Sequence, residues 1–259
     1  MAGTFHRVEP SAHRVALVEE GARIASLPAD ELAADVPTCP GWDIEALLGH
    51  LGGVHRWATS QLVAGVDGVR GRERPAPPAG ASILDWYRES LDGLVAEIDR
   101  HDPSEPTRSF IGECDVAFWM RRQAHETAMH RWDADHGIDA AGARPIEARL
   151  AVDGIDEWMT LFVPRFLVTK GDSVPPDLVG ATLHLHCTDD VDPGTGEWLL
   201  RLTADNVEVE RVHAKGDAAI RGAASDLALA VWHRPPRVDL DVVGDADKAA
   251  RILDAVHVG

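Results

Sequence analysis

"DIEALLGHLGGVHRWA", residues 43–58, reads as one amphipathic helix and decides the kind of fold that the chain adopts. Asp43 stands just before the first periodic residue and is a good N-cap, because its carboxylate can accept a hydrogen bond from a free N–H of the first turn. Leu47 and Leu51 recur at helical spacing and mark the stripe that such a helix buries. His50 lies within this stripe. We therefore expect the helix to pack in a bundle and to carry one imidazole toward the interior.

Helical periodicity runs through the first two thirds of the chain. The expected helices are Ser11–Leu27, Asp43 to about Gly65, Ser82–His101 and Asp115–His136. A fifth apolar stretch, Ile146–Phe162, is expected to stop near Pro164, because proline cannot continue a helix. Residues 66–81 are rich in Gly, Pro and Arg and are expected to form a loop. Four or five helices joined by loops predict a helical bundle, with no strand before about residue 140.

Beyond Lys170 the pattern changes from helical to alternating. In "ATLHLHCTD", residues 181–189, the apolar residues Leu183 and Leu185 alternate with His184 and His186, which predicts a strand with one buried face. Further strands are expected within 197–213 and 237–245, and helices at 225–234 and 245–256. Gly and Pro gather around residues 168–180. The predicted fold class is therefore α+β, with a helical domain over residues 1–168 and a smaller α+β domain over 178–259.

Composition excludes several classes of partner. The chain has 259 residues and a formal net charge of −18, which argues against binding to nucleic acid or to an anionic membrane surface. No apolar run is long enough for a membrane span, and Met1–Pro10 lacks the apolar core of a signal peptide. Cys39, Cys114 and Cys187 are odd in number and widely separated, as is typical of a reducing compartment. We expect a cytoplasmic protein.

A second stretch, "RRQAHETAMHRWDAD" (residues 121–135), resembles a metalloprotease helix only at first sight. His125 and His130 are five residues apart, so they lie about 140° apart around a helix and cannot share one metal ion. Glu126 and His130 are four residues apart, about 40° around the helix, and point to the same side. The arrangement of two histidines at i and i+4 that metalloproteases use is absent. What remains is a Glu/His pair that supplies two of three metal ligands.

His50 is the candidate for the third ligand. Taken alone, a buried imidazole is more often a hydrogen-bonded core histidine, Glu126 a solvated carboxylate or a partner of Arg122, and His130 a polar edge residue. Taken together, two inward helices that offer His50, Glu126 and His130 favour a metal ion, because bundles build such sites from facing helices. Two histidines and one carboxylate suit Zn²⁺ with an open coordination position, and also accept Fe²⁺, Ni²⁺ or Mn²⁺.

Other residues are weaker candidates. Cys39 in "TCPGW" has no evident activating base and is interpreted as a packed loop residue. His184 and His186 could bind a metal ion, but a solvated strand face is the preferred interpretation. Arg122 and Asp133 are candidates to contact the metal ligands and to hold them in orientation. Four tryptophans are expected to pack the bundle, and one of them is a candidate to line the pocket: Trp42, Trp57, Trp119 and Trp132.

The two stretches together resemble the N-terminal metal-binding domain of the mycothiol-dependent maleylpyruvate isomerase family, a branch of the DinB-like four-helix bundles. "AIRGAASDLALAVWHRPP" and "VDLDVVGDADKAARIL" are similar to the family's C-terminal α+β domain, whose shape is sterol-carrier-like. The resemblance implies metal ligands at His50, Glu126 and His130, with mycothiol, the actinobacterial thiol, as cosubstrate. It also implies a catalytic arginine at Arg234 in "VWHRPP", where His233 occupies the position at which Gly is expected.

The expected function is that of an enzyme whose metal ion, most simply zinc, holds a small thiol. Coordination deprotonates the thiol, and the thiolate adds to an electrophilic substrate. The outcome is cis–trans isomerisation of the maleylpyruvate type, or thiol S-transfer. Acidic groups on the thiol or substrate need positive charge, for which the candidates are Arg122, Arg234, Arg70, Arg72 and Arg74.

Two alternatives stay open. One is a non-catalytic metal-containing binding module, in which four protein ligands would saturate the metal ion. The other is a hydrolase with metal-bound water, for which His55 and Asp133 are the candidate general bases.

Overall fold

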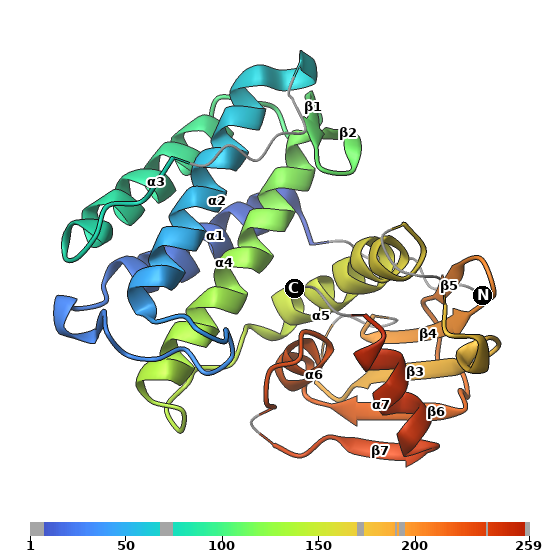
Figure 1. Ribbon diagram of the computed structural model, residues 1–259. Helices are drawn as coiled ribbons and strands as arrows, with labels where there is room; N and C mark the ends of the chain where they lie inside the picture. Colours follow the sequence, from blue (N-terminus) through green and yellow to red (C-terminus); the bar gives the residue numbers. More distant parts are fainter. Residues whose placement is uncertain are drawn as a thin grey trace. The chain divides into compact units, whose positions relative to one another are not determined.

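The computed structural model describes residues 8–67, 75–169, 174–189, 191, 195–236 and 238–256. These residues form two compact units, one built from Glu9–Arg144 and the other from Pro145–Gly259. A helical unit is followed by a sheet unit, which confirms the predicted α+β class (Figure 1).

The first unit is a bundle of four long helices, as predicted. They are α1 (Pro10–Ala25), α2 (Ile44–Ala64), α3 (Ser82–Ile98) and α4 (Val116–Ile138). The short 3-10 turns η1 (Ala29–Glu31) and η2 (Gly65–Asp67) lie in the connections. Helix α2 packs on α3 and on α4, and α1 packs on α4. The Asp43 side chain accepts a hydrogen bond from the N–H of Ala46 at 2.8 Å, so it is the N-cap that the sequence predicts.

The core of this unit is built along the predicted face of α2. Leu47, Leu48 and Leu51 are fully buried. Gly52 lets α3 approach closely, because a Cβ atom at this position would lie 2.3 Å from Cζ3 of Trp86. The bundle therefore holds α2 and α3 closer together than two ordinary side chains allow.

A short hairpin precedes α4, and the expectation of no strand before residue 140 is wrong. Strands β1 (Pro106–Ser109) and β2 (Gly112–Asp115) pair antiparallel across a two-residue connection. Gly112 has a φ of 112°, which a residue with a side chain rarely adopts. Four-residue strands with no Asn-Gly or Asp-Gly turn leave little alternation to detect. The Trp119 indole donates to the carbonyl of Arg108 at 3.0 Å and ties the hairpin to α4.

The second unit begins with a helix whose geometry changes along its length. Helix α5 (Ala148–Glu157) continues as π-helix in η3 (Trp158–Phe162) and η4 (Arg165–Thr169). The helical path thus passes Pro164, where it was expected to stop. Helix α5 packs against α6 and clusters with the sheet unit. The compact units divide between Arg144 and Pro145 for this reason, earlier than the predicted domain end at residue 168.

A five-stranded mixed sheet forms the centre of the second unit. Its strands are β3 (Thr182–Cys187), β4 (Glu197–Leu202), β5 (Val207–Glu210), β6 (Ala218–Gly222) and β7 (Asp241–Gly244), after the 3-10 turn η5 (Pro176–Leu178). The spatial order is β5-β4-β3-β6-β7. Strands β3 and β6 pair in parallel, and the other three pairs of neighbouring strands in this order are antiparallel. Strand β6 was not anticipated, whereas the other strands and the helices α6 (Ala224–Val231) and α7 (Ala246–Asp254) lie where the sequence predicts them.

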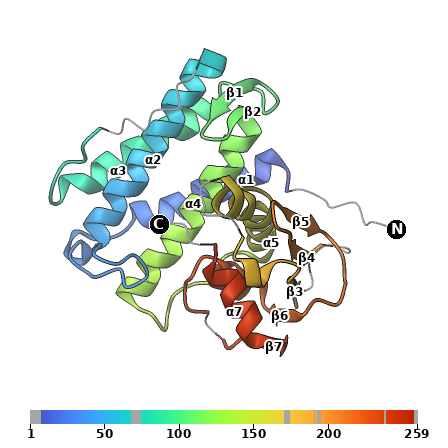
Figure 2. The same ribbon diagram turned by 45° about the vertical axis from the view of Figure 1, so that its right-hand side comes forward.

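The two faces of this sheet differ. Leu185 of β3 lies opposite Trp198 of β4, and both are fully buried. Helices α5 and α7 lie on one side of the sheet (Figure 2). The Trp198 indole donates to Oδ1 of Asp156 on α5 at 3.1 Å. His184, His186 and Glu197 alternate with these residues and lie on the other face.

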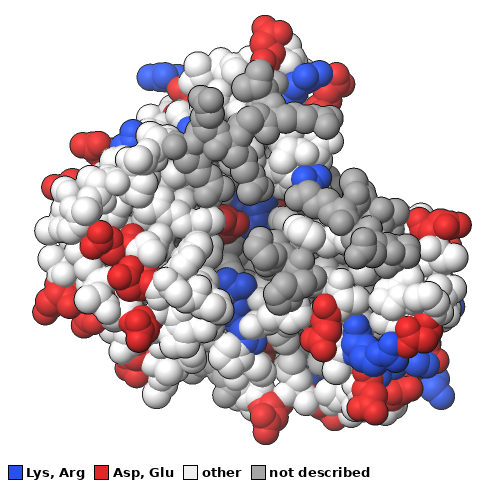
Figure 3. Space-filling view, viewed as in Figure 1, with Lys and Arg blue, Asp and Glu red and all other residues white. Residues whose placement is uncertain are grey.

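Charge is distributed unevenly over the surface. On the face drawn in Figure 3, acidic side chains spread along the outer edge of the helical unit, and acidic and basic side chains intermix over the sheet unit.

In the part of the chain that the structure describes, every helix is too short or too polar to span a membrane.

Candidate metal centre

The three predicted ligands come together inside the helical unit. His50 of α2 and Glu126 and His130 of α4 bring their ligand atoms within 4.8 Å of one another. Nε2 of His50 lies 3.2 Å from Oε1 of Glu126, and Nε2 of His130 lies 3.6 Å from the same oxygen. Helices α2 and α4 pack against each other, so the two halves of the cluster meet across a helix interface.

The spacing of these atoms fits a small divalent cation. A tetrahedral Zn²⁺ ion with bonds of about 2.0–2.1 Å separates any two of its ligand atoms by about 3.3–3.4 Å. The observed separations of 3.2 and 3.6 Å lie on either side of that value. The donor set, two imidazoles and one carboxylate, is one that catalytic zinc sites use.

Neighbouring side chains hold two of the ligands in orientation, as predicted for Arg122 and Asp133. Nη2 of Arg122 donates to Oε2 of Glu126 at 2.9 Å, which leaves Oε1 facing the imidazoles. Nδ1 of His130 lies 2.9 Å from Oδ2 of Asp133, whose side chain is completely buried. A carboxylate at Nδ1 fixes the proton there and leaves Nε2 as the ligand atom.

Cys39 belongs to this neighbourhood: it packs against the core of the helical unit, as interpreted, and it also has ionisable neighbours that the sequence did not reveal. Its Sγ lies 3.6 Å from Oδ2 of Asp133, and Oγ1 of Thr38 donates to Oδ1 of the same carboxylate at 2.6 Å. The turn before α2 brings both residues to α4, although they are more than ninety positions away in sequence. No local signal in the sequence reveals such a contact.

Trp42 forms an aromatic wall beside the cluster. Its ring centroid lies 4.7 Å from that of His50 and 6.0 Å from that of His130, and the two imidazoles are 5.1 Å apart. Of the tryptophans considered from the sequence, this is the one that lines the site.

Hydrogen bonds and neighbouring charges, more than burial, set the pKa values of Glu126 and His130. Burial raises the pKa of Glu126, but hydrogen bonds from His130 and His50 and the charge of Arg122 outweigh it, so this pKa lies well below its usual value. Burial lowers the pKa of His130, but hydrogen bonds to Asp133, Cys39 and Glu126 outweigh it and hold this pKa well above its usual value. The cluster therefore favours one positive charge between its carboxylates.

Two further histidines of these helices, His125 and His55, lie apart from the cluster. His125 is directed to α1, where its ring centroid is 5.6 Å from that of His13, which agrees with the helical angle between His125 and His130. His55 is fully buried, and its Nε2 lies 3.0 Å from Oγ1 of Thr127. Burial lowers the pKa of His55 to about 3, so this imidazole is neutral.

Solvent reaches the cluster from one side. The side chains of His50 and Glu126 are 25% and 23% exposed, whereas that of His130 is 10% exposed. A cation held by these three residues therefore has room for a small ligand from solution on the His50 side.

Arg234 lies in the second unit, directly after α6, where its Nη1 donates to the carbonyl of Trp232 at 2.8 Å. His233 has a φ of 59°, the left-handed conformation that explains why Gly is expected at this position. The catalytic role of Arg234 stays a prediction. The loop arginines Arg70, Arg72 and Arg74 lie outside the described residues.

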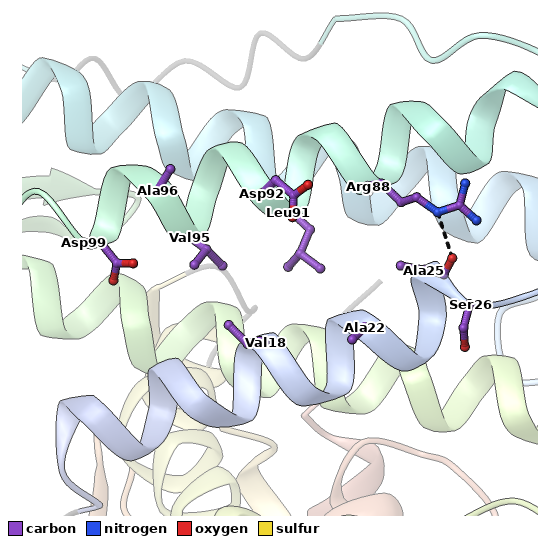
Figure 4. Close-up of a pocket in the computed structure, with 10 residues that line it drawn as sticks. All are labelled: Val18, Ala22, Ala25, Ser26, Arg88, Leu91, Asp92, Val95, Ala96 and Asp99. Carbon is purple, nitrogen blue, oxygen red and sulfur yellow. Dashed lines mark hydrogen bonds between the residues drawn. The ribbon is translucent and has the colours of Figure 1, made fainter.

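A groove between α1 and α3 has a volume of about 550 Å³ (Figure 4). Its wall is apolar around Val18, Leu91 and Val95, with Arg88 toward one end and Asp99 at the other. None of the three candidate ligands lines this groove.

Comparisons with known proteins agree with the family resemblance of the sequence and with the fold. Residues 15–135 match the family model of the mycothiol maleylpyruvate isomerase N-terminal domain. A crystal structure of a mycothiol-dependent maleylpyruvate isomerase resembles the chain with a TM-score of 0.61 at 10% identity, over 94% of this chain and 97% of that one. A mutant of such an isomerase gives a TM-score of 0.58 at 10% identity, over 88% and 90% of the two chains. No curated protein matches the sequence.

Proposed function

Since residues 15–135 match the family model of the mycothiol maleylpyruvate isomerase N-terminal domain, we propose that this chain is a metal-dependent enzyme of that family that uses mycothiol as cosubstrate. The proposed metal ion is Zn²⁺, held by His50, Glu126 and His130. The observation that carries the proposal is the meeting of these three side chains around Oε1 of Glu126.

The chain's own residues have distinct parts in this proposal. When bound, the metal ion would supply a thiolate at neutral pH, because coordination deprotonates a thiol. Arg122 holds Oε2 of Glu126 away from the imidazoles, and Asp133 keeps the Nδ1 proton on His130. Trp42 shields one side of both imidazoles from water.

The proposed reaction begins with addition of the thiolate to a carbon–carbon double bond conjugated to a carbonyl group. The former double bond becomes a single bond, about which the adduct can rotate. Expulsion of the thiolate re-forms the double bond and completes a cis–trans isomerisation of the maleylpyruvate type. Protonation of the adduct instead gives a thiol S-conjugate, and the enzyme is then a transferase. Arg234 is proposed to bind an acidic group of the thiol or the substrate.

The alternatives receive less support from the site. A hydrolase needs a general base near the metal ion. The Asp133 carboxylate is already hydrogen-bonded to His130 and Thr38. The His55 imidazole is buried and bonded to Thr127. A structural metal ion is saturated by four protein ligands, whereas the described cluster around Oε1 of Glu126 has three members.

The proposal is tested by titrating mycothiol calorimetrically into zinc-loaded and metal-stripped protein, together with an assay of maleylpyruvate isomerisation with and without mycothiol. Tight binding to the loaded protein only, and isomerisation that requires mycothiol, are expected. Equal affinity of mycothiol for the zinc-loaded and the metal-stripped protein would rule out the metal–thiolate mechanism. Mycothiol dependence with maleylpyruvate unchanged and a conjugate formed from another electrophile would select the transferase.

A further inference from the structure

A second cluster of metal-ligand side chains lies in the sheet unit, on the face opposite the helices. It consists of His184 and His186 of β3, Glu197 of β4, and His213, which follows β5. The ligand atoms of all four residues lie within 4.8 Å of one another. The preferred interpretation of the sequence, a solvated strand face, is wrong for His184, which is only 5% exposed.

The fold brings these residues together through the register of the sheet. His184 and His186 are two positions apart, so their side chains project from the same face of β3. His186 lies directly opposite Glu197 in the antiparallel β3–β4 pair. Strand β5 pairs with the far edge of β4, and the chain that leaves it returns His213 to the cluster.

All three imidazoles converge on one carboxylate oxygen. Oε2 of Glu197 is 3.0 Å from Nε2 of His184, 3.0 Å from Nδ1 of His186 and 2.5 Å from Nδ1 of His213. The ring centroids are 5.5–5.8 Å apart and the rings are nearly perpendicular, so the imidazoles meet at a point rather than stack.

Hydrogen bonds alone do not satisfy this arrangement well. Oε2 of Glu197 is hydrogen-bonded to His184 and His213, which occupies its two lone pairs, yet Nδ1 of His186 also lies 3.0 Å from this oxygen, one contact in excess of its capacity. A single cation among the four ligand atoms removes the excess, because each imidazole then offers a lone pair instead of a proton.

We propose that His184, His186, Glu197 and His213 bind a divalent first-row transition metal ion, with Zn²⁺ as the reference ion. Imidazole-rich sites select such ions, whereas Mg²⁺ and Ca²⁺ prefer oxygen ligands only. Four protein ligands make a closed, structural site. The ligand atoms need to move apart by several tenths of an ångström to reach the separation of about 3.3 Å in a tetrahedral zinc site. Through His213, the bound ion would link the β5–β6 connection to strands β3 and β4.

The test counts zinc ions in full-length protein after metal stripping. His50→Ala serves as the background, because it removes a ligand of the candidate centre in the helical unit. Calorimetric titration of this variant with Zn²⁺ should give one equivalent per chain. Adding Glu197→Gln or His213→Ala should weaken that binding at least about tenfold. His213 is exposed, so its substitution leaves the fold intact, which far-ultraviolet circular dichroism checks.

Glu208→Gln is the matched control. It makes the same substitution on β5, opposite Arg201, at a carboxylate outside the cluster. Zinc binding should keep its full affinity in this variant. The proposal is overturned if the His50→Ala background binds no zinc, or if Glu208→Gln weakens binding as much as Glu197→Gln does. Tetrahedral Co²⁺ absorption that survives His50→Ala and disappears with Glu197→Gln would support it independently.

Discussion

At the scale of single residues, Glu126 divides its two carboxylate oxygens between two tasks. Oε2 accepts from Arg122, and Oε1 faces His50 and His130. Arg122 is one helical turn before Glu126, so the same helix supplies both the ligand and the charge that orients it. A carboxylate held in this way is ready for a cation without rearrangement, which lowers the entropic cost of binding.

The histidines of α4 should respond differently to substitution. His130→Ala should remove the metal ion of the candidate centre, about one equivalent per chain, because it deletes one of its three proposed ligands. His125→Ala should retain a nearly wild-type content, since its ring lies beside His13 instead. Metal analysis of the purified variants, each expressed with added zinc, measures both. Equal loss in the two variants would show that the face of α4 was assigned to the wrong histidine.

At the scale of elements, capping residues explain why the helices could be predicted so well. Asp43 and Asp115 accept from backbone N–H groups at the starts of α2 and α4. The regular spacing of apolar residues after each cap then predicts where the helix begins and ends to within a few residues. The hairpin β1–β2 and the π-helical segments have no comparable local signal, because their geometry depends on contacts made by other parts of the chain.

Asp43→Ala should therefore lower the free energy of unfolding of the helical unit by about 1 kcal/mol, the usual contribution of an N-cap. Urea denaturation followed by circular dichroism measures this difference. Asp92→Ala is the control, because Asp92 is exposed within α3, where alanine is the better helix former. If Asp92→Ala destabilised the protein as much as Asp43→Ala does, the loss of a carboxylate rather than of the cap would be responsible.

The end of α4 should make the stability of the helical unit depend on pH. Burial raises the pKa of Asp135, but the hydrogen bond from Arg144 and the charges of Arg131 and Arg144 outweigh it, so the pKa is lowered on folding. A lowered pKa stabilises the folded state above the unfolded value of about 3.9. This stabilisation is lost as pH falls through the folded pKa.

Wild type and Asp135→Asn should accordingly differ most near neutral pH and converge in acid. Urea denaturation of both proteins at a series of pH values between about 7 and 3 gives the difference directly. A difference that stays constant over this range would mean that Asp135 acts through shape and not through its charge.

At the scale of the whole molecule, the sequence predicted the two-part architecture but not where the parts divide. The apolar stretch that becomes α5 looks like one more bundle helix, and only its packing on α6 assigns it to the sheet unit. The fourth member of the second cluster, His213, was likewise missed. It lies far from His184 in sequence, and the sheet order β5-β4-β3 is needed to connect them.

Each unit contains its own cluster, so added metal should stabilise both. A ligand at one hundred times its dissociation constant stabilises the folded state that binds it by about 2.7 kcal/mol. Scanning calorimetry of metal-stripped protein should therefore show higher unfolding temperatures after zinc is added. His50→Ala should abolish the part of the rise that belongs to the helical unit. Magnesium is the control, and a shift as large as that of zinc would argue against imidazole ligands at either site.

The position of Trp42 has an optical consequence. Its indole lies against both imidazoles of the candidate centre, and a protonated imidazole quenches indole emission by accepting an electron from the excited ring. A metal ion that displaces the proton changes this quenching, so the protein carries a built-in fluorophore for the state of the site. Tryptophan emission of the unmodified chain would then follow occupancy in real time and without a dye, and Trp42→Phe, which lacks this indole, measures the contribution of the other tryptophans.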